Sequence, residues 1–253
     1  MSDPTIAYRQ VQWLFVGLLC LSMFGCRKDE DVSPDLGQGN GQQSVVGIED
    51  FDGNHYGTVV IGNQKWMTSN LRTSRYSNGD PILYLPIPSQ WAADVSGAWS
   101  YYNGDAAYND TYGKFYNWFA VTDPRNVCPT GWRVPTDADW KELEMQLGLT
   151  QTLAGTYGWR GNTANIGGQL KYVEVWQSPN AGATNSSGFM ALPGGYKSVD
   201  GSFVGFGTEG FWWSATEHDP SLAWIRILSY QQEGTGRYQY LKQHGLYVRC
   251  VKN

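Results

Sequence analysis

The chain has 253 residues and a formal net charge of −5, with 16% charged and 15% aromatic residues, among them 12 Trp and 16 Tyr. This aromatic content excludes a disordered chain, which lacks such residues to bury. The 31 glycines argue against a helical bundle or a coiled coil. The net negative charge gives no sign of the positively charged surface that binds nucleic acid. Composition therefore indicates a globular domain, but it names no activity.

The N-terminus is typical of an export signal. Arg9 precedes an apolar run, residues 11–25, which is shorter than the roughly 20 residues of a membrane-spanning helix and fits a signal peptide. The run ends at Gly25-Cys26, and this junction resembles the lipobox of bacterial lipoproteins. The resemblance implies cleavage before Cys26 and attachment of lipid, palmitate included, to its thiol. A non-lipidated export signal or a membrane anchor is the alternative.

Residues 26–47 are expected to form a lipidated tether. Residues 27–31, RKDED, resemble the surface-export signal of Bacteroidota lipoproteins, although an ordinary solvated charge run is the alternative. Residues 32–47 are mostly Gly, Gln, Asn, Ser and Pro, a composition typical of a flexible linker. We therefore expect a lipid-anchored outer-membrane protein that faces the cell exterior and carries one folded domain, residues 48–253.

The four cysteines indicate one disulfide. Cys20 is expected to leave with the signal peptide, and Cys26 is expected to carry lipid. Cys128 and Cys250 remain in an exported, oxidising setting, where a single bridge is the simplest arrangement. A free or catalytic thiol pair is the alternative.

The first elements of the domain are a hairpin and a short helix. Residues 58–61 and 64–67 flank Gly62-Asn63 and predict two antiparallel strands. Residues 74–112 resemble long ordered loops. Within residues 113–121, Phe115, Trp118 and Phe119 stand at helical spacing and predict a short amphipathic helix.

The clearest helix is predicted over residues 136–147. Thr136 follows Pro135 and can cap the helix, Asp139 favours its N-terminus, and Gly148 ends it. Four acidic side chains of this helix could be mistaken for catalytic carboxylates, but we interpret them as a solvated face and helix-start charges; they are Asp137, Asp139, Glu142 and Glu144.

The second half of the chain predicts a meander of short strands. Turn residues separate the strand-like runs 189–192, 202–204, 211–214, 223–227 and 247–251. Residues 205–210 spell GxGxxG, but a strand rather than a helix follows. A glycine-rich turn is therefore expected instead of a phosphate cradle.

Seven blocks in the chain resemble the Fibrobacter succinogenes major paralogous domain family (FISUMP). They are residues 61–71, 113–118, 128–140, 168–171, 188–195, 212–217 and 247–252. This family is similar to C-type-lectin-like folds. The resemblance implies an α+β domain with two helices, a twisted antiparallel sheet, long loops and neighbouring termini, and a Cys128–Cys250 bridge fits it. It implies location and fold more than activity.

Candidate binding residues gather between positions 216 and 244. Tyr, Trp and Arg supply large, stiff contact areas and are enriched at binding hot spots. The alternative is that these aromatic residues only pack the faces of a sheet. The candidates are Glu217, His218, Asp219, Trp224, Arg226, Tyr230, Arg237, Tyr238 and Tyr240, with His244 close behind them.

These patterns predict a non-enzymatic cell-surface module that binds a glycan or a protein. A structural or accessory subunit of an outer-membrane assembly is the alternative, as is a ligand-binding protein diversified by retroelements. No catalytic residue, metal site or cofactor is expected. Glu217, His218 and Asp219 could hold a cation, but a solvated loop explains them better.

Overall fold

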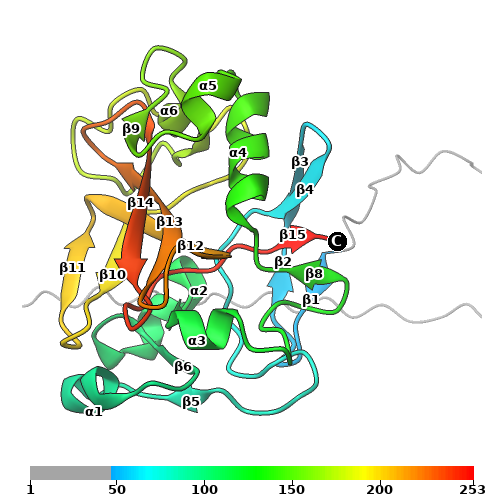
Figure 1. Cartoon of the computed structure of the whole chain (residues 1–253), viewed down its shortest axis with the longest axis vertical. Helices are drawn as coiled ribbons and strands as arrows, with labels where there is room; N and C mark the ends of the chain where they lie inside the picture. Colours follow the sequence, from blue (N-terminus) through cyan, green and yellow to red (C-terminus); the bar gives the residue numbers. More distant parts are fainter. Residues whose placement is uncertain (1–46) are drawn as a thin grey trace, which may run out of the picture. The chain divides into compact units, whose positions relative to one another are not determined.

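The computed structural model describes residues 47–253 (Figure 1). The predicted signal peptide, the lipidation site Cys26 and most of the tether lie outside the described residues. Within the described part, no helix has the length and apolar character that crossing a membrane requires. The described elements make an α+β domain whose largest sheet is antiparallel apart from one parallel pair.

A six-stranded sheet in the order β11-β10-β12-β13-β14-β9 forms the centre of the domain. The long strands β12, β13 and β14 pair antiparallel, and β10 runs parallel to β12. The strands are β9 (Gly158–Arg160), β10 (Gly194–Lys197), β11 (Phe203–Phe206), β12 (Glu209–Glu217), β13 (Leu222–Ser229) and β14 (Thr235–Leu241).

Smaller sheets and short helices complete the domain. Strands β3, β4, β15 and β8 form one sheet, β5, β6 and β7 another, and β1 pairs with β2. These strands are β1 (Ile48–Glu49), β2 (His55–Tyr56), β3 (Thr58–Ile61), β4 (Gln64–Met67), β5 (Leu83–Tyr84), β6 (Ala98–Ser100), β7 (Phe115–Tyr116), β8 (Trp132–Arg133) and β15 (Val251–Lys252). The helices are α1 (Pro88–Ala93), η1 (Tyr102–Gly104), η2 (Ala106–Tyr108), α2 (Asn109–Tyr112), α3 (Trp118–Val121), α4 (Asp137–Gln146), α5 (Gln151–Ala154) and α6 (Ile166–Leu170).

Helix α4 lies between the six-stranded sheet and the β3–β4 hairpin (Figure 1). Its predicted cap is confirmed: Thr136 and Asp139 form a reciprocal capping box. The indole of Trp140 lies 4.9 Å from that of Trp66 on β4 and donates a hydrogen bond to the carbonyl of Trp213 on β12. One residue of α4 therefore joins the hairpin to the sheet.

Two carboxylates of α4 are buried between the helix and the sheet. Asp137 and Glu144 are 4% and 0% exposed. The interpretation as a solvated face was therefore wrong for these two, although Asp137 is a helix-start charge in the first turn. Asp137 accepts hydrogen bonds from Arg226 at 2.9 Å and from Arg237 at 2.8 Å. Glu144 accepts from Arg226 at 2.7 Å and from Arg160 at 2.5 Å. The helical spacing of seven residues places both carboxylates on one face, opposite basic strand residues.

Strand pairing and one disulfide fix the C-terminal end of the domain to earlier parts of the chain. Val251 of β15 pairs with Trp66 of β4 and with Arg133 of β8. The predicted Cys128–Cys250 bridge is confirmed, and both cysteines are fully buried. The bridge closes a loop with a sequence separation of 122 residues, which includes the whole six-stranded sheet.

Lys171 fixes the long segment between α6 and β10. Its buried ammonium donates hydrogen bonds to the carbonyls of Ala181, Ser229 and Gln232 at 2.7, 3.0 and 3.0 Å. Ser229 is the last residue of β13, Gln232 belongs to the β13–β14 connection, and Ala181 belongs to the long segment. One cation therefore holds a loop of irregular backbone against the end of the sheet.

The hairpin over residues 58–67 and the glycine turn between β11 and β12 are confirmed. The helix predicted within residues 113–121 is shorter than expected. Phe115 and Tyr116 form β7 because they pair with β6, and α3 begins only after Asn117, whose side chain caps it.

Two predicted strands are also corrected. Residues 189–192 form no strand, because Met190 has a positive φ of 58° and Ala191 makes only one isolated bridge, to Lys171. Of residues 247–251, only Val251 belongs to a strand, and Tyr247 makes an isolated bridge to Trp212. Both segments are buried connections that run alongside the sheet.

Removal of the disulfide is expected to destabilise the domain. Replacement of both Cys128 and Cys250 by Ala should lower the free energy of unfolding by about 4 kcal/mol, because a loop of this length constrains the unfolded chain. Urea unfolding under oxidising conditions measures the effect, and reduction of the wild-type chain should reproduce it. Equal stability of the wild-type chain and the double variant would contradict this account.

Replacement of Asp137 is expected to leave buried arginines without their counter-charge. Burial alone would raise the pKa of Asp137, but the hydrogen bond from Arg237 and the charge of Arg226 outweigh it and hold the pKa well below its usual range. Asp137→Asn should therefore lower the free energy of unfolding by about 3 kcal/mol at neutral pH. The control is Glu142→Gln on the same helix, whose carboxylate accepts a hydrogen bond only from Gln146 among the described residues. A similar loss in both variants would count against the network.

Candidate functional site

The predicted binding residues are divided between the two faces of one sheet. In the β13–β14 pair, Trp224 lies opposite Gln239, Arg226 opposite Arg237, and Ile225 opposite Tyr238. Successive side chains of a strand point to opposite faces. Trp224, Arg226 and Arg237 therefore share the face that α4 covers, whereas Tyr238 and Tyr240 lie on the other face.

On the α4 face, the basic candidates are occupied by internal contacts. Arg226 and Arg237 are only 1% and 6% exposed, and both bind Asp137. The guanidinium of Arg237 also lies 3.3 Å from the ring centroid of Trp224. The ring of His218 meets the same indole edge-on at 4.9 Å. Arg226, Arg237 and Trp224 therefore make internal contacts on the side of the sheet that α4 covers, rather than forming an open surface.

The acidic candidates lie where β12 ends. Asp219 accepts hydrogen bonds from the backbone N–H groups of Ser221 and Leu222, both at 2.8 Å, and so shapes the β12–β13 turn. The Glu217 carboxylate lies 3.1 Å from the ammonium of Lys242. Within residues 47–253, no group of three His, Cys, Asp or Glu side chains could hold a metal ion.

The opposite face carries two groups of aromatic side chains, one around Tyr238 and one around Tyr240, two positions apart on β14. We call them together the aromatic row; it consists of Tyr157, Trp159, Tyr196, Tyr238, Tyr240 and His244. The phenol ring of Tyr238 lies 4.9 Å from that of Tyr157 and 6.3 Å from the indole of Trp159. Tyr240 lies 5.5 Å from Tyr196 and 5.0 Å from His244. These rings bring together β9, β14, β10 and the turn after β14.

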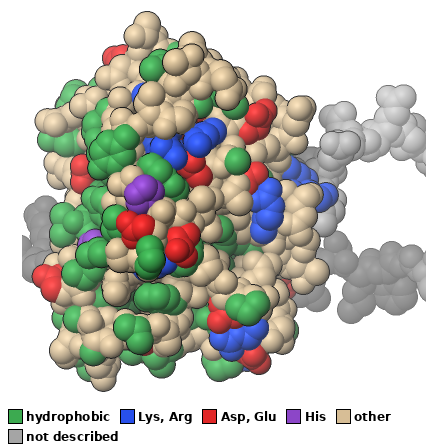
Figure 2. Space-filling model, viewed as in Figure 1, with side chains coloured by type: hydrophobic (Ala, Val, Ile, Leu, Met, Phe, Trp, Pro, Cys, Tyr) green, Lys and Arg blue, Asp and Glu red, His purple; other side chains and the backbone are tan. Residues whose placement is uncertain are grey.

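Tyr157 is the one exposed ring of the aromatic row. It is 59% exposed, whereas Trp159, Tyr196, Tyr238 and Tyr240 are half-buried and pack against the core. Beneath them, Phe211 of β12 lies 4.7 Å from Tyr196 and 5.7 Å from Tyr240. Figure 2 shows hydrophobic side chains scattered among polar ones on the face of the molecule seen in Figure 1. The row is therefore anchored at one end and open at the other.

The aromatic row is uncharged at neutral pH. Burial raises the pKa of Tyr196, Tyr238 and Tyr240, so these phenols stay protonated and remain hydrogen-bond donors. Burial lowers the pKa of His244 to about 4, so its imidazole is neutral. Its Nδ1 atom has no hydrogen-bond partner among the described residues. A surface of this kind favours neutral ligands that present both C–H groups and hydroxyls.

Sequence reasoning named three rings of the aromatic row, Tyr238, Tyr240 and His244, and missed three. Tyr238 and Tyr240 belong to the predicted segment, but Tyr157, Trp159 and Tyr196 come from positions far away in the chain. A local signal existed: Tyr157 and Trp159 alternate with Gly158, and period-two alternation is typical of a strand. Only the pairing of β9 with β14 places these rings next to Tyr238.

Tyr230, the remaining candidate, follows β13 and lies outside the row. Its carbonyl accepts a hydrogen bond from Ala181, and its N–H donates one to Thr208. Tyr230 therefore helps to hold the long segment in place.

A second aromatic cluster surrounds Phe206 at the end of β11. Tyr102 stacks on Phe206 at 4.3 Å, and Tyr112 and Tyr108 approach the same ring at 4.9 and 5.6 Å. These rings are half-buried and pack around a single centre. The cluster closes the loops before β7 over the edge of the sheet.

A family model described as the Fibrobacter succinogenes major domain matches residues 59–252. The chain belongs to this family. The predicted resemblance is thereby confirmed, while neither curated proteins nor solved structures gave a match. The matched range contains every ring of the aromatic row, both cysteines of the disulfide and the whole six-stranded sheet. The row is therefore part of the major domain itself.

His244 is expected to make this major domain sensitive to acid. Its pKa is lowered from 6.5 to about 4 in the folded state, so the unfolded chain takes up the proton first as the pH falls. Stability that depends on the neutral ring is complete above pH 6.5 and is lost as the pH falls toward 4. Unfolding by urea at pH 7 and pH 4.5 should show a smaller loss for His244→Phe than for the wild type. A constant difference between the two proteins across this range would contradict the prediction.

Proposed function

We propose that the major domain is a non-enzymatic binding module and that its aromatic row binds a glycan. A row of uncharged rings on a rigid sheet, exposed at Tyr157, is the observation that carries this proposal. Sugar rings present flat C–H faces to aromatic rings, and their hydroxyls are hydrogen-bond partners for phenols. Tyrosine and tryptophan also supply contact area at low entropic cost.

The surroundings of the row support a preformed site. Phe211 and Ile225 are buried beside the rings, on the same face of the sheet, and the strands are tied to α4 by the buried ion network. A ligand would therefore meet side chains that are already in position, which lowers the entropic cost of binding. The domain would hold its ligand by stacking and hydrogen bonding, without making or breaking a covalent bond.

We further propose that the module is displayed on the outer membrane by a lipid on Cys26, with the following residues as a tether. This part of the proposal rests on the N-terminal sequence. We also propose that the α+β arrangement is C-type-lectin-like. The pairing of β15 with β4, which brings the two ends of the domain together, is consistent with that arrangement.

The proposed function predicts a defined loss of binding on removal of one ring. Tyr238→Ala should weaken the binding of a glycan selected on an array by about ten-fold or more, as expected for an aromatic hot spot. Its melting temperature should change little because Tyr238 is half-buried. The array and a calorimetric titration of the full chain in detergent measure these effects.

The matched control is Tyr84→Ala, because Tyr84 is 38% exposed and lies outside the row. This variant should bind the glycan like the wild type. Equal affinity of wild type and Tyr238→Ala would show that the row is not the site. A blank array with a well-folded chain, together with stable co-purification of outer-membrane proteins, would favour an accessory subunit instead.

A further inference from the structure

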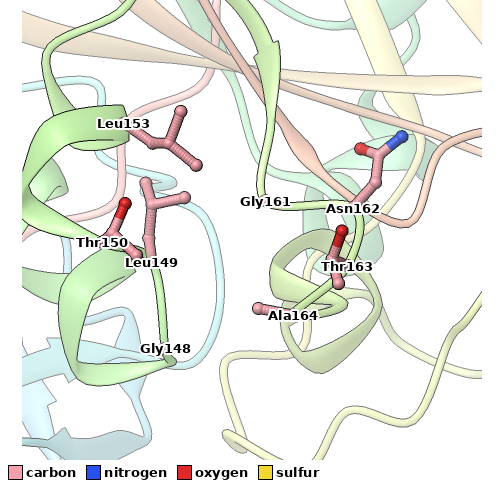
Figure 3. A pocket seen from close by; sticks show the side chains of 8 residues that line it. All are labelled: Gly148, Leu149, Thr150, Leu153, Gly161, Asn162, Thr163 and Ala164. Carbon is pink, nitrogen blue, oxygen red and sulfur yellow. The ribbon is translucent and has the colours of Figure 1, made fainter.

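A small pocket lies between the α4–α5 connection and the loop that follows β9 (Figure 3). It has a volume of about 260 Å³. One wall is formed by Gly148, Leu149, Thr150 and Leu153, and the other by Gly161, Asn162, Thr163 and Ala164. Its size matches a single sugar unit or substituent rather than a larger ligand, since drug-sized ligands need roughly 300 Å³ or more.

The pocket combines an apolar interior with polar groups at its edge. In Figure 3 the side chains of Leu149 and Leu153 point from one wall toward the other, where Ala164 presents its methyl group. The hydroxyls of Thr150 and Thr163 make no hydrogen bond within residues 47–253, and both residues are exposed. No charged side chain lines the pocket. This chemistry suits a neutral group that has both a methyl and hydrogen-bonding atoms.

The two walls are held together by one side chain. The amide of Gln169 on α6 donates hydrogen bonds to the carbonyl of Leu147 and to the carbonyl of Ala164, both at 2.9 Å. The carbonyl of Ala164 belongs to one wall, and Leu147 directly precedes Gly148 of the other. The pocket is therefore present before any ligand arrives.

Glycine keeps the interior of the pocket open. A Cβ atom at Gly161 would lie 2.5 Å from Ile166 and 3.1 Å from Leu149, and the backbone there has a φ of +77°. Any other residue would crowd the inner wall and strain the turn.

We propose that this pocket binds the acetamido group of an N-acetylated sugar. The methyl of that group would contact Leu149, Leu153 and Ala164, while its amide and the neighbouring hydroxyls would meet the threonine hydroxyls. This inference rests on the proposed function, because it names the class of glycan that the module selects. Leu153 of the pocket lies on α5 and Tyr157 of the aromatic row lies in the connection from α5 to β9, so both lie at one end of the sheet (Figure 1).

The test compares two trisaccharides that differ mainly in this group. N-acetylated chitotriose carries an acetamido group on each ring where cellotriose carries a hydroxyl. The full chain in detergent should bind chitotriose about ten-fold more tightly than cellotriose, the discrimination that one buried methyl with its polar partner provides. Saturation-transfer NMR should also show the acetamido methyl as the ligand group closest to the protein.

Two variants test whether the preference for chitotriose arises in this pocket. Ala164→Leu fills the pocket and should remove the ten-fold preference, while Thr150→Val keeps the shape of the wall and should weaken chitotriose several-fold. The matched control is Thr152→Val, an exposed position on α5 that does not line the pocket. It should leave both affinities unchanged.

Each outcome decides the inference separately from the proposed function. Equal affinity for the two trisaccharides, or a preference that survives in Ala164→Leu, overturns the pocket assignment. If Tyr238→Ala then still weakens both ligands, the aromatic row remains the glycan site. Failure of the chain to bind either trisaccharide also overturns the assignment, and the array described above then decides whether the row binds any glycan.

Discussion

Two buried carboxylates on α4 decide how the two faces of the central sheet differ. Asp137 and Glu144 hold Arg160, Arg226 and Arg237, which come from β9, β13 and β14. Because strand residues alternate between faces, fixing these arginines beneath α4 directs Trp159 and Tyr238 to the opposite face. No described helix covers the outer end of that face, where Tyr157 is exposed. The ion network thus explains both the support of the sheet and the position of the aromatic row.

Such a network costs desolvation, and its contribution to stability depends on complete pairing. Each carboxylate oxygen of Asp137 accepts at least one hydrogen bond from an arginine. The benefit is an ordered sheet whose outer face consists of neutral rings. Lys171 serves a similar purpose for the long loop, because its ammonium holds three backbone carbonyls that irregular backbone would otherwise leave unpaired. Buried cations therefore organise this domain in two separate places.

Much of the fold could be predicted from local sequence signals. The hairpin at Gly62-Asn63 and the helix that begins after Thr136 depend on turn and capping chemistry, which acts within a few residues. The strand predicted over residues 189–192 was wrong because apolar residues in a buried connection look like those of a strand. The helix predicted from Phe115 was shortened because pairing with β6 outweighed helical spacing at that point. These errors arise from tertiary contacts that no local pattern contains.

The candidate site was harder to predict, for a related reason. The segment from 216 to 244 was correctly chosen as rich in aromatic and charged residues, but its functional reading depends on which face each residue occupies. Arg226 looked like a surface residue because its partners, Asp137 and Glu144, lie more than 80 positions earlier in the chain. Conversely, Tyr157 and Tyr196 carried no sign that they join Tyr238 and Tyr240. Strand order, rather than composition, assembles the row.

The most direct test of the account is an NMR titration of the full chain with selectively labelled tyrosine rings. A glycan that binds on the array should shift the ring signals of Tyr157, Tyr196, Tyr238 and Tyr240. The signals of Tyr102, Tyr108 and Tyr112, which belong to the separate cluster around Phe206, should stay in place. Shifts confined to that second cluster, or binding without any change in the four row tyrosines, would contradict the assignment of the aromatic row as the binding surface.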